Sequence, residues 1–356
     1  MNNNSPYYYL SKYRSELMGL SILLVVWFHS SIDYASAAIP RVWNLLLWLK
    51  NTGYAGVDFF FMLSGMGLFR SLQKNPVPVY AKNRLKRILP TWWVYLVIFY
   101  ICAGIYLEEP CTLKEMFGFA TCTGWWFGVK NAGNWFIHAI MFLYLVSPFF
   151  TLYITQSESK VRACLTLIAV SFVLSLGAAG HLKMSLFARL PLFLVGMSFP
   201  ACLGELEMNR RRWAVCGLTC LAGIALLVYS FLHLEAYLVK YGLYWYPFLL
   251  IAPCLLLMIG KLFDLSEKAC RPLLCLLAKL GKASFEILMI TDLFYSVIVN
   301  AEVWNLFPNW LSTRALALSG LLLGCLFHIL IDAGHRLFES GIASIRAKSR
   351  SGCPEG

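Results

Sequence analysis

Two ionisable residues lie inside long apolar segments of this chain, and their types suit proton transfer. His29 lies near the end of the segment LMGLSILLVVWFHS, and Asp58 lies near the start of GVDFFFMLSGMGLF. Ionisable side chains are costly within apolar segments of bilayer length and usually mark a reaction centre or a transport pathway. An imidazole can accept a proton from a hydroxyl, and a nearby carboxylate can orient the ring and stabilise the imidazolium. The alternative is that the two residues pair only to join two helices.

The composition places these residues in a membrane protein. Of the 356 residues, 59% are hydrophobic and 13% are charged, and the mean hydropathy is +0.66. A soluble protein of this length needs a far larger polar fraction to cover its surface. The sequence therefore predicts an all-α fold, a polytopic bundle of transmembrane helices in a lipid bilayer.

Apolar stretches long enough to span a bilayer, which requires about 20 residues, occur ten times along the chain. The predicted spans are residues 15–32, 53–71, 88–107, 133–154, 161–180, 186–203, 212–232, 243–261, 282–300 and 315–337. They predict one transmembrane domain over residues 1–343. Residues 344–356 are predicted to form a short, basic, disordered tail.

Lysine and arginine are distributed unequally between the two sides of this predicted bundle. If the N-terminus is cytoplasmic, 22 of the 30 fall on the cytoplasmic side. The other eight are Arg41, Lys50, Lys114, Lys130, Lys183, Arg189, Lys240 and Arg314. This bias follows the positive-inside rule and predicts a multi-pass protein of the cell membrane with both termini cytoplasmic. It also explains the net charge of +12 through anionic lipid, which fits better than nucleic-acid binding.

Six sequence phrases extend this interpretation from the fold to a family. In chain order they are ELMGLSILLVVWFHS, GYAGVDFFFMLSGMGLFRSL, NRLKRILPTWWVY, NWFIHAIMFLYLVSP, ARLPLFLVGMSF and LGKASFEILMI. Together, over about residues 10–300, they resemble the acyltransferase 3 family of bacterial integral-membrane acyltransferases, which modify cell-surface carbohydrates.

This resemblance implies a reaction and a catalytic residue. The expected donor is a cytoplasmic acyl-CoA, with acetyl-CoA the expected form, and the expected acceptor is a hydroxyl group of a cell-surface or exported glycan. His29 matches the histidine of the family's first helix, which is thought to be the catalytic centre. It is expected to act as a base or as an acyl relay, with Asp58 at a similar depth on the neighbouring helix. No metal is expected.

Three arginines are candidates for binding the CoA donor. Arg84 and Arg87 directly precede the third predicted span on the inner side, and their guanidinium groups suit phosphates. Family members usually carry Arg or Lys eleven residues before the histidine, where this chain has Met18. Arg14 lies one helical turn earlier on the same face, from which its long side chain could extend towards that place. The alternatives are that Arg84 and Arg87 only set the topology and that Arg14 anchors the helix to lipid.

Other residues are candidates for the acceptor side or differ from the family. Arg189, in the phrase ARLPLF, could hold a carbohydrate or a developing oxyanion. Trp135 could stack on a sugar, although anchoring at the membrane interface would explain it equally well. His138 is interpreted first as an interhelical hydrogen-bonding group. The family often has histidine at the position of Thr291.

Two further clusters have structural interpretations. His328, Asp332 and His335 recur on one helical face, where a packed or solvated polar face is favoured over a metal site. Cys111 and Cys122 share a predicted outer loop, and a disulfide between them is geometrically possible.

Two other function classes remain open for the bundle as a whole. A transporter or flippase would also carry ionisable groups within its spans, and inverted repeats or broken helices in corresponding halves would favour it. A non-catalytic membrane sensor on the same fold is the other alternative. Met18, at a position where the family usually has Arg or Lys, favours this alternative.

Overall fold

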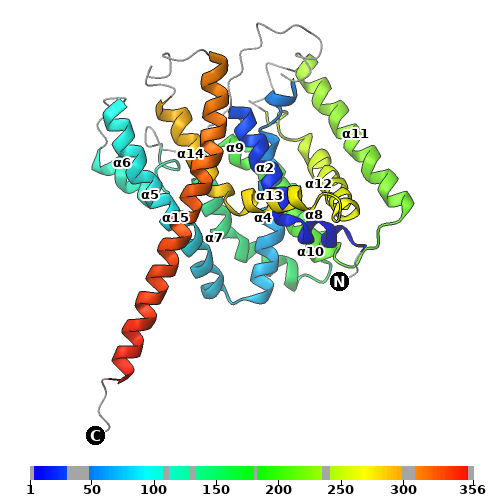
Figure 1. Ribbon diagram of the computed structural model, residues 1–356. Coiled ribbons are helices and arrows are strands. Elements are labelled where there is room, and N and C mark those ends of the chain that lie inside the picture. Colours follow the sequence, from blue (N-terminus) through cyan, green and yellow to red (C-terminus); the bar gives the residue numbers. More distant parts are fainter. Residues whose placement is uncertain are drawn as a thin grey trace.

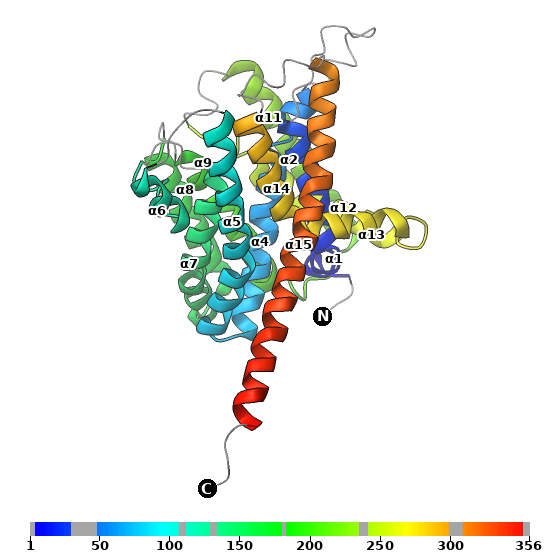
Figure 2. The same ribbon diagram turned by 60° about the vertical axis from the view of Figure 1, so that its left-hand side comes forward.

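The computed structural model describes residues 4–29, 48–106, 112–128, 134–179, 183–234, 241–298 and 309–351, and no strand occurs among them. The long helices stand side by side as one bundle (Figure 1). The start of α1 and the end of α15 lie at the same end of that bundle in both views (Figures 1 and 2). The helices, in chain order, are α1 (Pro6–Lys12), α2 (Arg14–His29), α4 (Ala55–Lys74), α5 (Val77–Tyr106), α6 (Leu113–Ala120), α7 (Trp135–Gln156), α8 (Lys160–Gly177), α9 (Met184–Phe187), α10 (Leu190–Cys202), α11 (Arg210–His233), α12 (Phe248–Ser266), α13 (Arg271–Lys282), α14 (Ser284–Leu293), the π-helix η2 (Phe294–Ile298) and α15 (Asn309–Ser351).

The all-α transmembrane architecture predicted from the sequence is confirmed. Eight helical segments among the described residues are long and apolar enough to cross a membrane. They correspond to α4, α5, α7, α8, α9 with α10, α11, α12 and most of α15. The remaining two predicted spans correspond to α2, which has 16 residues, and to α14 followed by η2.

These two shorter segments lie in the interior of the bundle. α2 contacts α4, α13, α14 and α15, and most side chains of α14 are buried. A helix that other helices surround is exposed to little lipid, so its length need not match the bilayer as closely. The candidate histidine therefore lies at the end of a central helix.

Glycine allows two pairs of helices to approach unusually closely. A Cβ atom at Gly281 of α13 would lie 1.8 Å from the Ser15 carbonyl oxygen of α2, and one at Gly19 would lie 2.0 Å from that of Leu277. α4 and α10 repeat the arrangement, where a Cβ at Gly196 would lie 2.0 Å from the Met62 carbonyl oxygen. Small residues at such crossings let helix backbones pack directly against each other, which is a common way to join helices in a membrane.

Several helices have limits that differ from those of the predicted spans. α5 begins at Val77, before the third predicted span begins at residue 88, so Arg84 and Arg87 belong to a helix. The sixth predicted span, residues 186–203, corresponds to the segment from Met184 to Cys202, which is divided at Arg189 into α9 and α10. The segment from Ser344 was predicted to be disordered, but α15 continues to Ser351. A helix can begin before its apolar run or continue after it, so the limits of the run do not fix the limits of the helix.

α13 has a different orientation from the spans. It lies across the long helices and projects from the bundle (Figure 2). Its first turn contains Pro272, and its last turn contains Lys279 and Lys282. Proline is favoured at a helix start and cations at a helix end. α13 is thus a short helix that runs across the bundle and connects α12 to α14.

Candidate active site

His29 is the last residue of α2, at the end of the bundle opposite the start of α1 (Figure 1). Its ring is partly buried and meets the ring of Phe28 edge-on, with 5.2 Å between centroids. The turn before α4 and the first turn of α4 pack against this end of α2, where a Cβ at Gly53 would lie 2.7 Å from the Leu24 carbonyl oxygen and one at Gly56 would lie 2.3 Å from that of Ser21. The imidazole therefore lies beside the α2–α4 contact.

Asp58 has a different partner from the one that the sequence suggested. Its carboxylate forms an ion pair with Arg189, with 3.1 Å between Oδ1 and Nε, and not with His29. Both side chains are almost completely buried, with 1% and 4% of their surfaces exposed. Arg189 follows the short helix α9, and Asp58 is in the first turn of α4. The pair therefore connects two spans that are 131 residues apart in the chain.

The guanidinium group of Arg189 is enclosed on its other sides as well. It lies 5.2 Å from the ring centroid of Trp135 and 5.1 Å from that of Trp245. It also donates a hydrogen bond to the Ser185 carbonyl oxygen, with 2.8 Å between the atoms. Indole faces attract cations, so these contacts help to keep the charge of Arg189 inside the bundle. Arg189 and Trp135, the two candidates for acceptor binding, thus contact each other.

The three candidate donor-binding arginines come together at one cavity. The cavity has a volume of about 260 Å³, and Arg14, Arg84 and Arg87 all line it. Lys282, at the end of α13, is a fourth cation in its wall. Met18 is also in the wall, so Arg14 and Met18 lie on the same face of α2 beside the same space.

Hydrogen bonds hold the arginines in place. Arg14 donates from Nε to the Leu63 carbonyl oxygen at 3.1 Å. Arg84 donates to Ser71 Oγ at 3.0 Å, and Arg87 donates to the Lys282 carbonyl oxygen at 2.9 Å. Each guanidinium group has five N–H donors, so these contacts leave further donors for a ligand.

Part of the cavity wall is apolar. Its apolar walls are formed by Met18, Phe60, Leu68, Ile88, Phe136, Ile140, Phe285 and Leu288. Cationic and apolar side chains in the wall of one cavity fit a molecule with phosphates at one end and a less polar chain at the other.

Two cations near these candidates were not predicted to have a role. Lys282 was predicted only as a cytoplasmic charge, although it ends α13 and lines the arginine cavity. Lys50 was counted only as an outer charge, although its ammonium group lies within electrostatic range of His29. Burial lowers the pKa of Lys50 below its ordinary value. The sequence shows that both residues are cations, but it does not show that they lie near the candidate site residues.

The remaining candidates occupy polar contacts within the helix bundle. His138 is fully buried, and its Nδ1 lies 3.3 Å from the Asn134 carbonyl oxygen. His328 Nδ1 lies 3.2 Å from Glu286 Oε2, and Asp332 Oδ2 lies 3.9 Å from His328 Nε2.

Thr291 and Asp292 are the residues at the second departure from the family pattern. Thr291 is buried, and the carboxylate of Asp292 accepts a hydrogen bond from the Tyr95 hydroxyl at 2.6 Å. Among the residues that the structure describes, no group of three or more His, Cys, Asp or Glu side chains could hold a metal ion. Cys111, one half of the possible disulfide, lies outside the described residues.

The fold and the site together define a multi-pass membrane protein with a cationic cavity at one end and a histidine at the other. Comparison with protein families gives the particular class, because the acyltransferase domain of the acyltransferase 3 family matches residues 17–329. The chain therefore belongs to the acyltransferase 3 family, as its sequence phrases suggested. No curated protein and no solved structure matches the chain.

Proposed function

We propose that the protein transfers an acyl group, in the simplest case acetyl, from cytoplasmic acyl-CoA to a hydroxyl group of a cell-surface or exported glycan. Family membership supports acyl transfer in a membrane. The convergence of Arg14, Arg84 and Arg87 on one cavity carries the proposal of a CoA donor. Phosphates of CoA would bind these guanidinium groups, and the pantetheine arm would extend along the apolar wall.

His29 is the proposed catalytic residue. In direct transfer, its imidazole accepts the proton of the acceptor hydroxyl as the oxygen attacks the thioester carbonyl. The carbon–sulfur bond then breaks, and the CoA thiolate leaves and takes up a proton. In a relay, an imidazole nitrogen attacks the thioester carbonyl, the carbon–sulfur bond breaks, and the CoA thiolate leaves and takes up a proton. The acceptor hydroxyl then attacks the acyl-imidazole, loses its proton and releases the imidazole.

The length of α2 separates the proposed donor site from His29. Arg14 and His29 are separated by 15 residues of helix, which corresponds to about 22 Å. The donor must extend along α2 from the arginine cavity for its thioester to reach His29. This separation supports the proposal that the arginines bind the donor and that His29 acts in the chemical step at the acceptor end.

Asp58 and Arg189 are proposed to position the acceptor end. Their ion pair fixes the start of α4 against the α9–α10 break, beside Trp135. Because the pair is buried, we propose that it holds the acceptor site in shape and does not itself react with the substrate.

The experiment combines two variants with one control in purified, reconstituted protein supplied with radiolabelled acetyl-CoA and cell-envelope glycans. His29→Ala should abolish acylation while CoA affinity stays unchanged. Replacing Arg84 and Arg87 together with Gln should weaken CoA binding by about 1–3 kcal/mol for each charged hydrogen bond lost. Lys at both positions should rescue binding only partly, because an ammonium group lacks the planar fork.

His233→Ala is the matched control, since His233 is an exposed histidine at the end of α11. It should leave both acylation and CoA affinity unchanged. Near-normal acylation by His29→Ala would exclude the proposed mechanism. Unchanged CoA affinity in the Arg84/Arg87 variant would show that these residues act only as topology signals. Movement of unmodified glycan across the membrane, with no acylation, would support a flippase instead.

A further inference from the structure

A second cavity lies where α10, α11 and α12 meet, and it is separate from the arginine cavity on α2. Its volume is about 500 Å³. Arg211 and Arg212, in the first turn of α11, line one end of it. Most of the remaining lining is apolar and consists of Pro6, Phe199, Leu203, Leu206, Met208, Val215, Cys216, Pro253, Cys254 and Leu257.

The cavity is elongated along α11. Arg211 and Thr219 both line it and are eight residues apart, which corresponds to about 12 Å of helix. Val215 lies between them and is 55% exposed on the surface of the bundle. α11 lies at the outer edge of the bundle (Figure 1). The cavity therefore has a cationic end and an apolar groove that runs along a lipid-facing helix.

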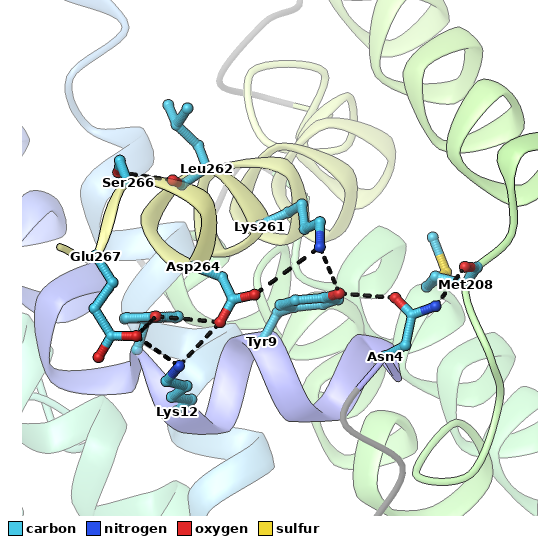
Figure 3. A network of polar contacts seen from close by, with 10 residues as sticks. Asn4, Tyr9, Lys12, Met208, Lys261, Leu262, Asp264, Ser266 and Glu267 are labelled. Atoms are coloured by element: carbon cyan, nitrogen blue, oxygen red, sulfur yellow. Dashed lines mark hydrogen bonds and ion pairs between the residues drawn. The ribbon is translucent and has the colours of Figure 1, made fainter. Parts of the chain in front are cut away.

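Hydrogen bonds at the N-terminus hold one wall of this cavity. The Asn4 side chain donates to the Met208 carbonyl oxygen at 2.9 Å, and the Met208 N–H donates to the Asn4 carbonyl oxygen at the same distance. Asn4 also accepts a hydrogen bond from the Tyr9 hydroxyl at 2.7 Å (Figure 3). Pro6, which lies between Asn4 and Tyr9 in the chain, lines the cavity together with Met208.

Ion pairs connect the same helix, α1, to the end of α12. Lys12 Nζ lies 2.9 Å from both Asp264 Oδ1 and Glu267 Oε2, and Lys261 donates to the Tyr9 hydroxyl at 3.0 Å (Figure 3). The hydrogen bond from Lys12 is the largest cause of the lowered pKa of Glu267. The walls from α1, α12 and the segment before α11 are therefore fixed to one another.

The charge at the cationic end points to an anionic ligand. Arg211 and Arg212 are exposed, and no acidic side chain is among the described residues that line the cavity. Arg212 donates to the Glu207 carbonyl oxygen, which orients its guanidinium group beside the opening. The positive-inside bias assigns this end of α11 to the cytoplasmic side, where the membrane surface is negatively charged.

We propose that this cavity binds an anionic glycerophospholipid of the cytoplasmic leaflet. The lipid phosphate would contact Arg211 and Arg212, and one acyl chain would lie in the groove between α11 and α12. A soluble phosphate would satisfy the arginines but would leave the apolar groove without a partner. The lipid accounts for both ends of the cavity, and the proposal does not depend on which acyl group or acceptor the protein uses.

The test measures lipid retained by the purified full-length protein in native mass spectrometry, after addition of phosphatidylglycerol or phosphatidylcholine. Wild-type protein should retain phosphatidylglycerol in preference to phosphatidylcholine. The double variant Arg211→Gln/Arg212→Gln should retain on the order of tenfold less phosphatidylglycerol, since each cation near an anionic headgroup contributes a several-fold preference. Arg210→Gln is the control, because Arg210 belongs to the same triplet but does not line the cavity.

A second variant and a soluble anion separate the lipid from its phosphate. Val215→Trp fills the groove and leaves both arginines in place, so it should also lower phosphatidylglycerol retention. Inorganic phosphate at millimolar concentration should not displace the lipid. Equal retention of the two lipids would overturn the proposal, as would an Arg210→Gln effect equal to that of the double variant. Displacement by inorganic phosphate would show that only an anion site is present. If Val215→Trp does not fold, the proposal is tested by comparing phosphatidylglycerol retention between the Arg211→Gln/Arg212→Gln variant and the Arg210→Gln control.

Discussion

At Asp58 and Arg189, two opposite charges lie inside the bundle, and each charge depends on the other. Removing water from an ion pair is expensive, and its attraction compensates only when the geometry is good and the remaining donors are satisfied. The groups around the guanidinium of Arg189 are Asp58, the Ser185 carbonyl oxygen and the faces of Trp135 and Trp245, and of these only Asp58 carries a full negative charge. A change to one partner should therefore cost more than a change to both.

Asp58→Asn should destabilise the protein by about 3–5 kcal/mol, because it leaves a buried guanidinium group without a counter-charge. The double variant Asp58→Asn/Arg189→Met should recover a large part of that loss. Thermal unfolding in detergent measures both, with acylation assayed in the same preparations. A single variant that keeps its melting temperature but loses all acylation would instead assign Asp58 directly to the chemistry.

At the scale of elements, the crossing of α2 and α13 links the proposed donor site to the helix that carries the histidine. α2 carries Arg14 at one end and His29 at the other, and α13 ends at Lys282, whose carbonyl oxygen holds Arg87. Gly19 and Gly281 set the spacing of these helices. The crossing thus fixes how the wall of the arginine cavity sits relative to the helix that carries the histidine.

Gly281→Ala should force α13 away from α2, because its new Cβ would lie 1.8 Å from the Ser15 carbonyl oxygen. Overpacking of this kind costs about 1–3 kcal/mol, and the displaced Lys282 should also weaken CoA binding. Gly334→Ala on α15 is the control, because a Cβ there meets no atom within 4 Å. Melting temperature and CoA affinity are the measurements. A Gly281→Ala protein that matches wild type in both would show that the crossing tolerates separation.

At the scale of the whole molecule, the ten predicted spans place both termini on one side. The structure supports this in one respect, since the start of α1 and the end of α15 lie at the same end of the bundle (Figures 1 and 2). The charge bias then predicts that this end is cytoplasmic. The arginine cavity would open where acyl-CoA is present, and His29 would lie towards the opposite surface.

Reporter fusions should confirm this orientation. A reporter joined after Lys130 should be found on the outer side, and one joined after Gly356 should be found in the cytoplasm, because an odd number of the predicted spans lies between them. Activity and accessibility of each reporter in intact cells are the measurements. Fusions that report the same side would show that a span is missing or additional.

The sequence by itself was sufficient to predict the class of fold and the identity of the family. A bilayer requires apolar segments of a minimum length with their backbone hydrogen bonds satisfied internally, so the spans are visible in composition alone. The short segments α2 and α14 were recognised in the same way, although neither alone reaches the length of a full span. The family phrases, with His29 at the end of the first, led to the same conclusion as the family match to residues 17–329.

Only the tertiary structure decided which side chains meet. Arg14 and Arg84 are 70 positions apart in the numbering and line one cavity because α2 and α5 pack into the same bundle. Asp58 lies against Arg189, since its neighbours are set by how α4 packs on α10 and not by hydropathy. Hydrophobic patterning records how deeply a residue is buried in lipid or protein. In a span that is apolar on nearly every side, it does not show how the helix is rotated about its axis, and that rotation determines the partner of each buried charge.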